Sequence, residues 1–324
     1  MSSAFKLALR AAIRRRACDP SPIRLALLLG CALVLALAGI AAQHVAAAPA
    51  ATRAGAKIVR AEPPGALQAA AARLAPQQPG ITDIYALGVA GWAELDVFPK
   101  EIDGAFRALA QILPIRDHTL RLINSNSGAK NGGKSGGKGD AKTVPLANRK
   151  NFAAAVQALG GRMDKDEDVL LLVMSSHGTS GANGGFALQL PDRSMQMLTP
   201  HELKSVLDGE GIKHRIVIVS ACYSGKFVWP LANDNTIVLT AADAMSSSFG
   251  CAAGRDWTFF GDALFRQSIQ PGTNLWRAFE HAKVLIHGWE TLDRLPPSNP
   301  QAHFGPALMR KLEPVIEAAA HAGQ

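Results

Sequence analysis

The stretch from Val169 to Gly178 reads VLLLVMSSHG, and the stretch from Ile216 to Gly225 reads IVIVSACYSG. Each begins as a continuous apolar run, which is typical of a strand buried on both faces of a sheet. A third apolar run spans Thr236–Thr240. Helical spacing of apolar residues recurs between these runs, and strands that alternate with helices predict an α/β fold with a mostly parallel sheet covered on both faces.

The same kinds of pattern predict further strands and helices on either side of these runs. Two more strands are expected at Ile84–Ala90 and Thr119–Ile123. The segment Thr199-Pro200-His201-Glu202 has the form of a capping box with proline at the first helical position, so a helix begins there. Other helices are predicted from apolar spacing at Ile102, Phe106, Leu109 and Leu113, at Phe152, Val156 and Leu159, and at Leu275, Phe279, Ala282 and Ile286.

The two most apolar strands both end in a reactive side chain, His177 in the first and Cys222 in the second. In parallel α/β sheets, sites form beyond the carboxyl ends of the strands. If the two strands are neighbours, the imidazole and the thiol face one crevice, and a nearby base converts a thiol into a nucleophilic thiolate. The alternative for each residue alone is structural: a turn histidine, and a small buried cysteine.

These blocks resemble those of the legumain-like cysteine peptidases, in the wider caspase-type clan. The resemblance rests on VMSSHG at 173–178 and SACYSG at 220–225, and it continues through TAAD at 240–243, SSFGC at 247–251 and TFFGD at 258–262. It covers roughly Ile81 to His287. It implies a caspase-like fold and a cysteine endopeptidase that acts on protein or peptide substrates through a thioester.

The resemblance also implies roles for single residues. Cys222 would be the nucleophile, His177 the general base and acid, and the Gly178 amide an oxyanion donor. Ser248 and Asp262 would line the substrate pocket, together with Ser220 and Asp243. The sequence departs from legumain at Ser220, where the family has an acidic residue, and it has no counterpart of the pocket arginine or of the asparagine that orients the histidine. An acidic, hydroxyl-lined pocket suits a small polar or amide side chain, or a cation. Because the pocket arginine is missing, we expect asparagine to be accepted before aspartate.

The amino-terminal region is predicted to be a membrane leader. Residues 25–42 contain no charge, and Arg14-Arg15-Arg16 precede them. We expect residues 25–44 to be a transmembrane signal anchor, or a signal peptide cleaved near Ala46-Ala47-Ala48. The basic tail at 1–24 would lie in the cytoplasm, and the catalytic domain would be periplasmic at a bacterial inner membrane, or secreted if the leader is removed.

The net charge of +8 is concentrated in two short segments. Residues 1–24 contribute +5 and residues 124–142 contribute +3, so the rest of the chain is neutral. A bulk basic surface for nucleic acid is therefore not expected. We predict an Ala/Pro-rich linker at 45–80, a peptidase domain at 81–290 and a tail with a helix at 291–324.

Residues 124–142 are predicted to be a flexible insertion rich in Gly, Ser and Lys. Within it, Gly128–Ser135 matches the phosphate-loop pattern G-x-x-x-x-G-K-S. A phosphate loop needs a helix to begin at the Lys-Ser pair, and Gly136-Gly137-Lys138-Gly139 is a poor helix start. A nucleotide-binding module is therefore a weaker alternative to the peptidase, as is a catalytically silent, membrane-tethered binding domain.

No cofactor is expected, because a thiolate attacks a carbonyl group without a metal or an organic cofactor. Cys251 lies in an apolar segment, and we expect it to be buried rather than catalytic. The oligomeric state is not predicted.

Overall fold

The computed structural model describes residues 65–115, 117–126 and 144–322. The strands are β1 (Ile84–Ala90), β2 (Thr119–Ile123), β3 (Val169–Ser175), β4 (Phe186–Gln189), β5 (Met195–Leu198), β6 (His214–Ser220), β7 (Thr236–Thr240) and β8 (Gln301–Phe304). The helices are α2 (Ala66–Ala71), α3 (Val97–Leu109), α4 (Arg149–Gly160), α5 (Pro200–Gly209), η2 (Ser224–Phe227), α6 (Val228–Leu231), α7 (Phe259–Gly261), the π-helical η3 (Asp262–Ser268), α8 (Leu275–Asp293) and α9 (Pro306–Ala322).

The main sheet has six strands in the order β2-β1-β3-β6-β7-β8. All neighbouring pairs are parallel except β7 and β8, which are antiparallel. This confirms the predicted α/β class with a mostly parallel sheet. The order places β3 and β6, the two strands that precede His177 and Cys222, side by side at the centre.

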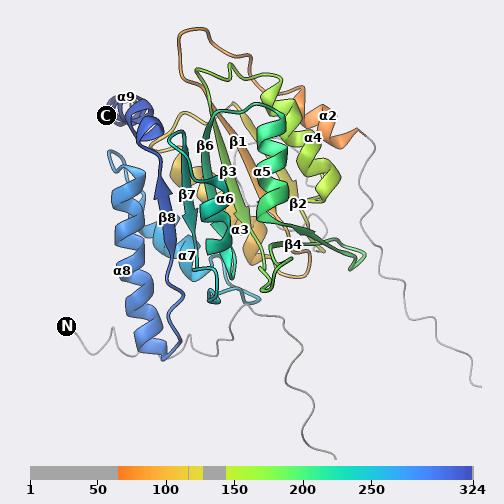
Figure 1. Cartoon of the computed structure of the whole chain (residues 1–324), viewed down its shortest axis with the longest axis vertical. Coiled ribbons are helices and arrows are strands. Elements are labelled where there is room, and N and C mark those ends of the chain that lie inside the picture. Colours follow the sequence, from red (N-terminus) through yellow and green to blue (C-terminus); the bar gives the residue numbers. More distant parts are fainter. Residues whose placement is uncertain (1–64, 116, 127–143, 323–324) are drawn as a thin grey trace, which may run out of the picture.

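Helices cover both faces of this sheet (Figure 1). Helices α4, α5 and α6 lie in front of it in that view, and α3 and α7 lie behind. Two separate sets of buried apolar residues fill the space between the sheet and these layers. Successive residues of a strand point to opposite faces. For this reason Leu171 and Val173 of β3 belong to the cluster on the α3 side, and Leu170 and Leu172 belong to the other.

The predicted strands and helices agree well with the structure where the sequence signals are strong. The strands expected at Ile84–Ala90 and Thr119–Ile123 have those bounds. Helix α5 begins with the capping box, because the Thr199 side chain accepts from the Glu202 amide and the Glu202 side chain accepts from the Thr199 amide. Helix α3 ends earlier than expected, at Leu109, and Leu113 is buried beyond its end.

Other elements have weaker signals and were not predicted. The β4–β5 hairpin follows His177, and β8 adds an antiparallel edge from residues beyond 290. Helix α2 lies within the predicted linker at 45–80, where Leu67 and Leu74 are buried. Helix α9, in contrast, is the helix predicted within the tail at 291–324, and it packs Leu308 and Leu312 into the core. These segments join the folded unit because each presents a few apolar side chains that the sheet buries.

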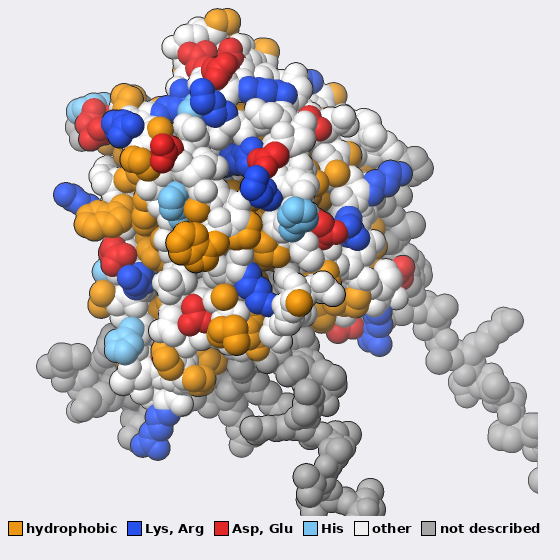
Figure 2. Space-filling model, viewed as in Figure 1, with side chains coloured by type: hydrophobic (Ala, Val, Ile, Leu, Met, Phe, Trp, Pro, Cys, Tyr) orange, Lys and Arg blue, Asp and Glu red, His pale blue; other side chains and the backbone are white. Residues whose placement is uncertain are grey.

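The face covered by α4, α5 and α6 carries charges of both signs (Figure 2). Lysine and arginine are interspersed with aspartate and glutamate on the surface seen in that view. The predicted insertion at 124–142 and the phosphate-loop match at Gly128–Ser135 fall almost entirely outside the described residues.

Candidate active site

The candidate nucleophile stands on a sharp turn at the carboxyl end of β6. The strand ends at Ser220, and Tyr223, the residue after Cys222, has a left-handed backbone conformation with φ 57°. A non-glycine residue seldom adopts this conformation, and such strain is found most often at functional sites. The Tyr223 amide donates to the Ser246 carbonyl at 2.8 Å. The turn is thereby held against the loop that follows β7.

The Cys222 thiol is buried and faces Ser248. Cys222 is 2% exposed, and the Ser248 amide donates to Sγ at 3.3 Å. The Ser248 hydroxyl lies 3.7 Å from the same sulfur. A backbone N–H aimed at sulfur can hold negative charge there. The structure thus brings the sequence-predicted pocket residue Ser248 into contact with the predicted nucleophile.

The imidazole of His177 is packed between aromatic rings. Its ring lies edge-on to Trp92 at 4.5 Å and to Phe98 at 5.2 Å between centroids, and the residue is 8% exposed. Edge-to-face packing fixes a ring's orientation as well as its position. Trp92 follows β1 and Phe98 is in the first turn of α3, and neither was predicted as a site residue.

Gly178 brings the backbone after β3 into direct contact with Cys222. A Cβ atom at position 178 would lie 1.9 Å from the Cys222 carbonyl oxygen. No other residue type fits this approach without displacement of the backbone. The register of β3 and β6 pairs Ser175 with Ser220, so that His177 and Cys222 follow at matching positions two residues later.

The β4–β5 hairpin holds the His177 segment from the other side. The Ala187 amide donates to the His177 carbonyl at 2.9 Å, and the Ser176 hydroxyl donates to the Ala187 carbonyl at 2.7 Å. Lys226 of η2 donates to the Gly181 carbonyl at 2.8 Å. Burial lowers the pKa of Lys226. The segments after His177 and after Cys222 are therefore joined to each other.

The remaining predicted pocket residues have their hydrogen bonds elsewhere. Asp262 forms an ion pair with Arg266 of its own helix at 2.7 Å. Asp243 accepts from the Met245 amide and from Asn299 at 2.7 and 3.0 Å. Burial raises the pKa of Asp243, but these hydrogen bonds outweigh that effect and lower it. The structure thus leaves both carboxylates engaged with neighbours.

Ser220 faces the interior of the domain. Next to it lies the carboxyl group of Glu101, which was not predicted from the sequence as a site residue. The Ser220 hydroxyl lies 3.1 Å from the Thr258 hydroxyl, and the Ser220 side chain lowers the pKa of Glu101 of α3. Glu101 is fully buried. A signal was present, because Glu101 occupies a position on the apolar face of an amphipathic helix, between Phe98 and Ile102.

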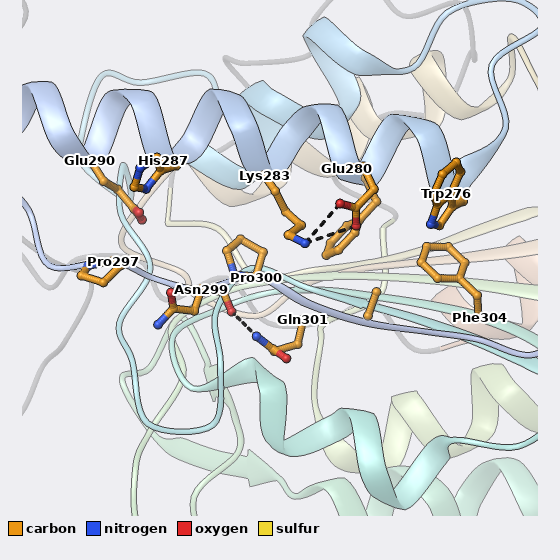
Figure 3. Close-up of a pocket in the computed structure, with 12 residues that line it drawn as sticks. Trp276, Glu280, Lys283, His287, Glu290, Pro297, Asn299, Pro300, Gln301 and Phe304 are labelled. Atoms are coloured by element: carbon orange, nitrogen blue, oxygen red, sulfur yellow. Dashed lines mark hydrogen bonds and ion pairs between the residues drawn. The ribbon is translucent and has the colours of Figure 1, made fainter.

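Two cavities in the described part of the chain lie away from Cys222. One of about 510 Å³ lies between α8 and the segment leading into β8, where Figure 3 shows Lys283 and Glu280 paired above Gln301. The other, of about 600 Å³, lies near the start of β1 and includes Asp83 and His118. Cavity size therefore does not locate the candidate site.

Neither a metal cluster nor a membrane-spanning helix is found within the described ranges. No group of three or more His, Cys, Asp or Glu side chains there is arranged to hold a metal ion. None of the helices from α2 to α9 combines the length and the apolar character needed to cross a bilayer. The predicted membrane segment at 25–44 lies outside these ranges.

Comparison with known proteins agrees with the predicted family. Residues 144–302 match the model of the Peptidase C13 family, a segment that includes His177 and Cys222. A solved structure of caspase-1 from Spodoptera frugiperda is similar to 71% of this chain and 93% of its own, with a TM-score of 0.45 and 10% identity. No curated protein matches. Residues 144–302 are therefore similar to the Peptidase C13 family, the legumain family of cysteine-type peptidases, which are hydrolases, and this similarity supports a cysteine-type peptidase.

Proposed function

We propose that Cys222 and His177 form the catalytic dyad of an endopeptidase that works through a thioester. One observation carries the proposal: β3 and β6 are parallel neighbours, and Gly178 approaches the Cys222 carbonyl so closely that no side chain fits between them. A nucleophile and a base on adjacent strand ends are what covalent catalysis requires. The match of residues 144–302, which include both residues, to a cysteine peptidase family supports the same pair.

The proposed reaction has two steps. In the first, Cys222 Sγ attacks the substrate carbonyl carbon while His177 accepts the thiol proton, and the imidazolium then gives that proton to the leaving amine as the C–N bond breaks. In the second, His177 removes a proton from water. The resulting hydroxide attacks the thioester, the C–S bond breaks, and the thiolate is regenerated with a free carboxylic acid product.

The Gly178 amide is proposed to stabilise the oxyanion that forms in each step. Negative charge develops on the carbonyl oxygen as the thiolate attacks, and a fixed N–H donor lowers the barrier. The position of Gly178 against the Cys222 backbone supports this role. The Ser248 amide, which donates to Sγ, is proposed to stabilise the thiolate before attack.

We propose that Ser248 contributes to the pocket for the residue before the scissile bond. Its hydroxyl is close to the nucleophile, so that it can contact a side chain attached to the carbonyl under attack. Asp262 and Asp243 are proposed to act at the outer part of this pocket, and a substrate would compete with Arg266 for Asp262. For the residue before the scissile bond, we still expect the peptidase to prefer asparagine to aspartate.

A peptide electrophile tests the nucleophile directly. We expect an acyloxymethyl ketone on a short asparaginyl peptide to label the wild-type protein at one thiol. Mass spectrometry of the digested protein should locate the adduct on Cys222. The matched variant Cys251→Ser should be labelled like the wild type, and Cys222→Ser should not be labelled. If folded Cys222→Ser is still labelled, the assignment of Cys222 as the nucleophile is wrong.

The same experiment separates the peptidase from a silent binding domain. The burial of Cys222, at 2% exposed, is the observation that favours the silent alternative, since a closed site does not admit substrate. A folded wild-type protein that is neither labelled nor active on any member of a peptide library would support the binding domain. Labelling together with hydrolysis supports the enzyme.

We also propose that the catalytic domain is tethered at the bacterial inner membrane and lies in the periplasm. The proposal rests on the uncharged run at 25–42 and the arginines that precede it. A reporter that is active only in the periplasm, fused after Gln324, should be active. Activity of a cytoplasm-only reporter at the same position would reverse the topology, and a mature terminus near Pro49 would show that the leader is cleaved.

A further inference from the structure

A carboxyl group lies in the core directly beneath the proposed dyad. Glu101 is 0% exposed and belongs to the second turn of α3, on the helix face that also carries Phe98 and Ile102. Removing a carboxyl group from water is costly unless hydrogen bonds replace the lost hydration. The partners of Glu101 therefore indicate why it is there.

Three polar groups from three different elements converge on this carboxyl group. The Ser175 hydroxyl donates to Oε1 at 2.7 Å, and the Thr258 amide donates to Oε2 at 2.8 Å. The Ser220 side chain is the third group: it lowers the pKa of this carboxyl group, and its hydroxyl lies 3.1 Å from the Thr258 hydroxyl. Ser175 ends β3, Ser220 ends β6, and Thr258 caps the start of α7. One side chain thus joins both dyad strands to the segment that leads to the proposed pocket.

Ser175 and Ser220 lie close in sequence to the two dyad residues. They are register partners, and each precedes a dyad residue by two positions. Residues two apart on a strand point to the same face. Glu101 therefore contacts the strand ends two residues before His177 and Cys222, while Phe98, one turn earlier on α3, packs against the His177 ring itself.

The segment from Thr258 also packs closely against the Glu101 carboxyl group. A Cβ atom at Gly261 would lie 2.0 Å from Glu101 Oε2, so α7 packs directly on the carboxyl group. Asp262 is the next residue along the chain. The position of the proposed pocket segment relative to the strand ends is consequently set by contact with Glu101.

We infer that Glu101 is a positioning residue of this peptidase, which fixes the ends of β3 and β6 and the segment from Thr258 in the arrangement that the dyad needs. It acts through Ser175, Ser220 and Thr258 rather than on the substrate. The inference rests on the proposed dyad. A displacement of about 1 Å in a catalytic group can lower a rate roughly a hundredfold, so loss of this contact should be visible in turnover.

The raised pKa of Glu101 suggests glutamine as a conservative replacement. Burial raises the pKa of Glu101, and hydrogen bonds from Ser220, Thr258 and Ser175 oppose that effect only in part. Glutamine has the same shape. Its amide oxygen can accept from the Thr258 N–H while its amide nitrogen donates to a serine hydroxyl, which rotates to accept. Alanine leaves all three donors without the carboxyl group and creates a cavity.

The test compares Glu101→Ala and Glu101→Gln by kcat and KM on one fluorogenic peptide, and by the rate of Cys222 labelling. We expect Glu101→Ala to lower kcat about 10- to 100-fold, with a smaller change in KM, and to slow labelling by a similar factor. Glu101→Gln should recover most of both. Ser175→Ala removes only one hydrogen bond to Glu101 and should lower kcat several-fold. If Glu101→Ala does not fold, Ser175→Ala is used in its place.

Asp168 provides a matched control at the other end of the sheet. It is also a fully buried carboxyl that accepts two backbone hydrogen bonds, from Asp83 and Asp164. Asp168→Ala should lower the melting temperature as Glu101→Ala does, with kcat unchanged. The inference is overturned if folded Glu101→Ala keeps the wild-type kcat and labelling rate, or if Asp168→Ala loses as much kcat.

The outcome also distinguishes this inference from the proposed function. If Cys222→Ser still cleaves the peptide, the dyad is wrong and the Glu101 inference falls with it. If Cys222→Ser is inactive while Glu101→Ala and Ser175→Ala cleave at the wild-type rate, the dyad stands and only the positioning role is wrong.

Discussion

The two ends of the parallel sheet both bury ionisable groups, but they use them differently. At the amino end, Asp168 accepts from the Asp83 and Asp164 amides at 3.0 and 2.8 Å. At the carboxyl end, Glu101 accepts from the Ser175 hydroxyl, two residues before His177, and from the Thr258 amide. Burial raises the pKa of Asp168 and of Glu101 alike.

A buried, perturbed carboxyl group is therefore not sufficient to mark a site. The larger cavity is also at the amino end, beside Asp83 and His118. What distinguishes the carboxyl end is the convergence of a thiol, an imidazole and a backbone contact that only glycine permits. In parallel α/β sheets this is the end where loops meet to form sites.

The largest expected effect comes from the dyad itself. Cys222→Ser and His177→Ala should each lower kcat/KM by several orders of magnitude, and the double variant should be little worse than either one, because the pair acts as a unit. Hydrolysis of a fluorogenic peptide gives the rates, and circular dichroism checks folding. Independent effects that multiply in the double variant would contradict the dyad.

The next effect comes from the glycine contact between the two strand ends. In Gly178→Ala the new methyl group would lie 1.9 Å from the Cys222 carbonyl oxygen, so the strand ends must separate. We expect kcat/KM to fall by about a hundredfold. The control is Gly209→Ala at the end of α5, where a Cβ meets nothing within 4 Å. Wild-type activity in Gly178→Ala would show that the close approach is not needed.

At the amino end, the expected effect is on stability and not on catalysis. In Asp168→Asn one oxygen that accepts a backbone amide becomes an NH2 group, which faces a donor. We expect the free energy of unfolding to fall by roughly 1–3 kcal/mol, measured by urea denaturation, with kcat unchanged. A loss of activity in the folded variant would mean that the two ends of the sheet are coupled.

The smallest effect concerns Tyr85, which is also near the amino end and packs against the His118 ring. Burial, followed by the nearby Asp168 and Asp83 carboxylates, raises the pKa of Tyr85 to about 12. The native state thus favours the protonated phenol. The stability that it contributes is complete below the unfolded pKa of about 10 and is lost as the pH rises toward 12.

Tyr85→Phe should accordingly remove part of the alkaline loss of stability. Its cost at neutral pH should be below about 1 kcal/mol, because the hydroxyl makes a long hydrogen bond of 3.4 Å to the Arg162 carbonyl. Unfolding curves of both proteins at pH 8 and pH 11 test this. Identical pH dependence in the two proteins would contradict the assignment.

The central strands and the reactive strand ends were predictable from sequence, whereas the support around them was not. Continuous apolar runs such as 169–174 indicate buried strands because they are too short for a helix that is buried all round. His177 and Cys222 stand out because polar residues follow directly. The β4–β5 hairpin, by contrast, has Met195 at 49% exposure and no strong alternation, so its pattern is weak.

The α/β class, the candidate reactive pair and the resemblance to the legumain-like peptidases follow from the amino-acid sequence alone, because they depend on local apolar patterns and short motifs. Three features follow only from the folded chain: β3 and β6 are neighbours, Trp92 and Phe98 orient His177, and Glu101 joins the strand ends to Thr258. The residues concerned are far apart in the chain. Their contacts arise from the order of strands and the packing of α3, which no local pattern encodes.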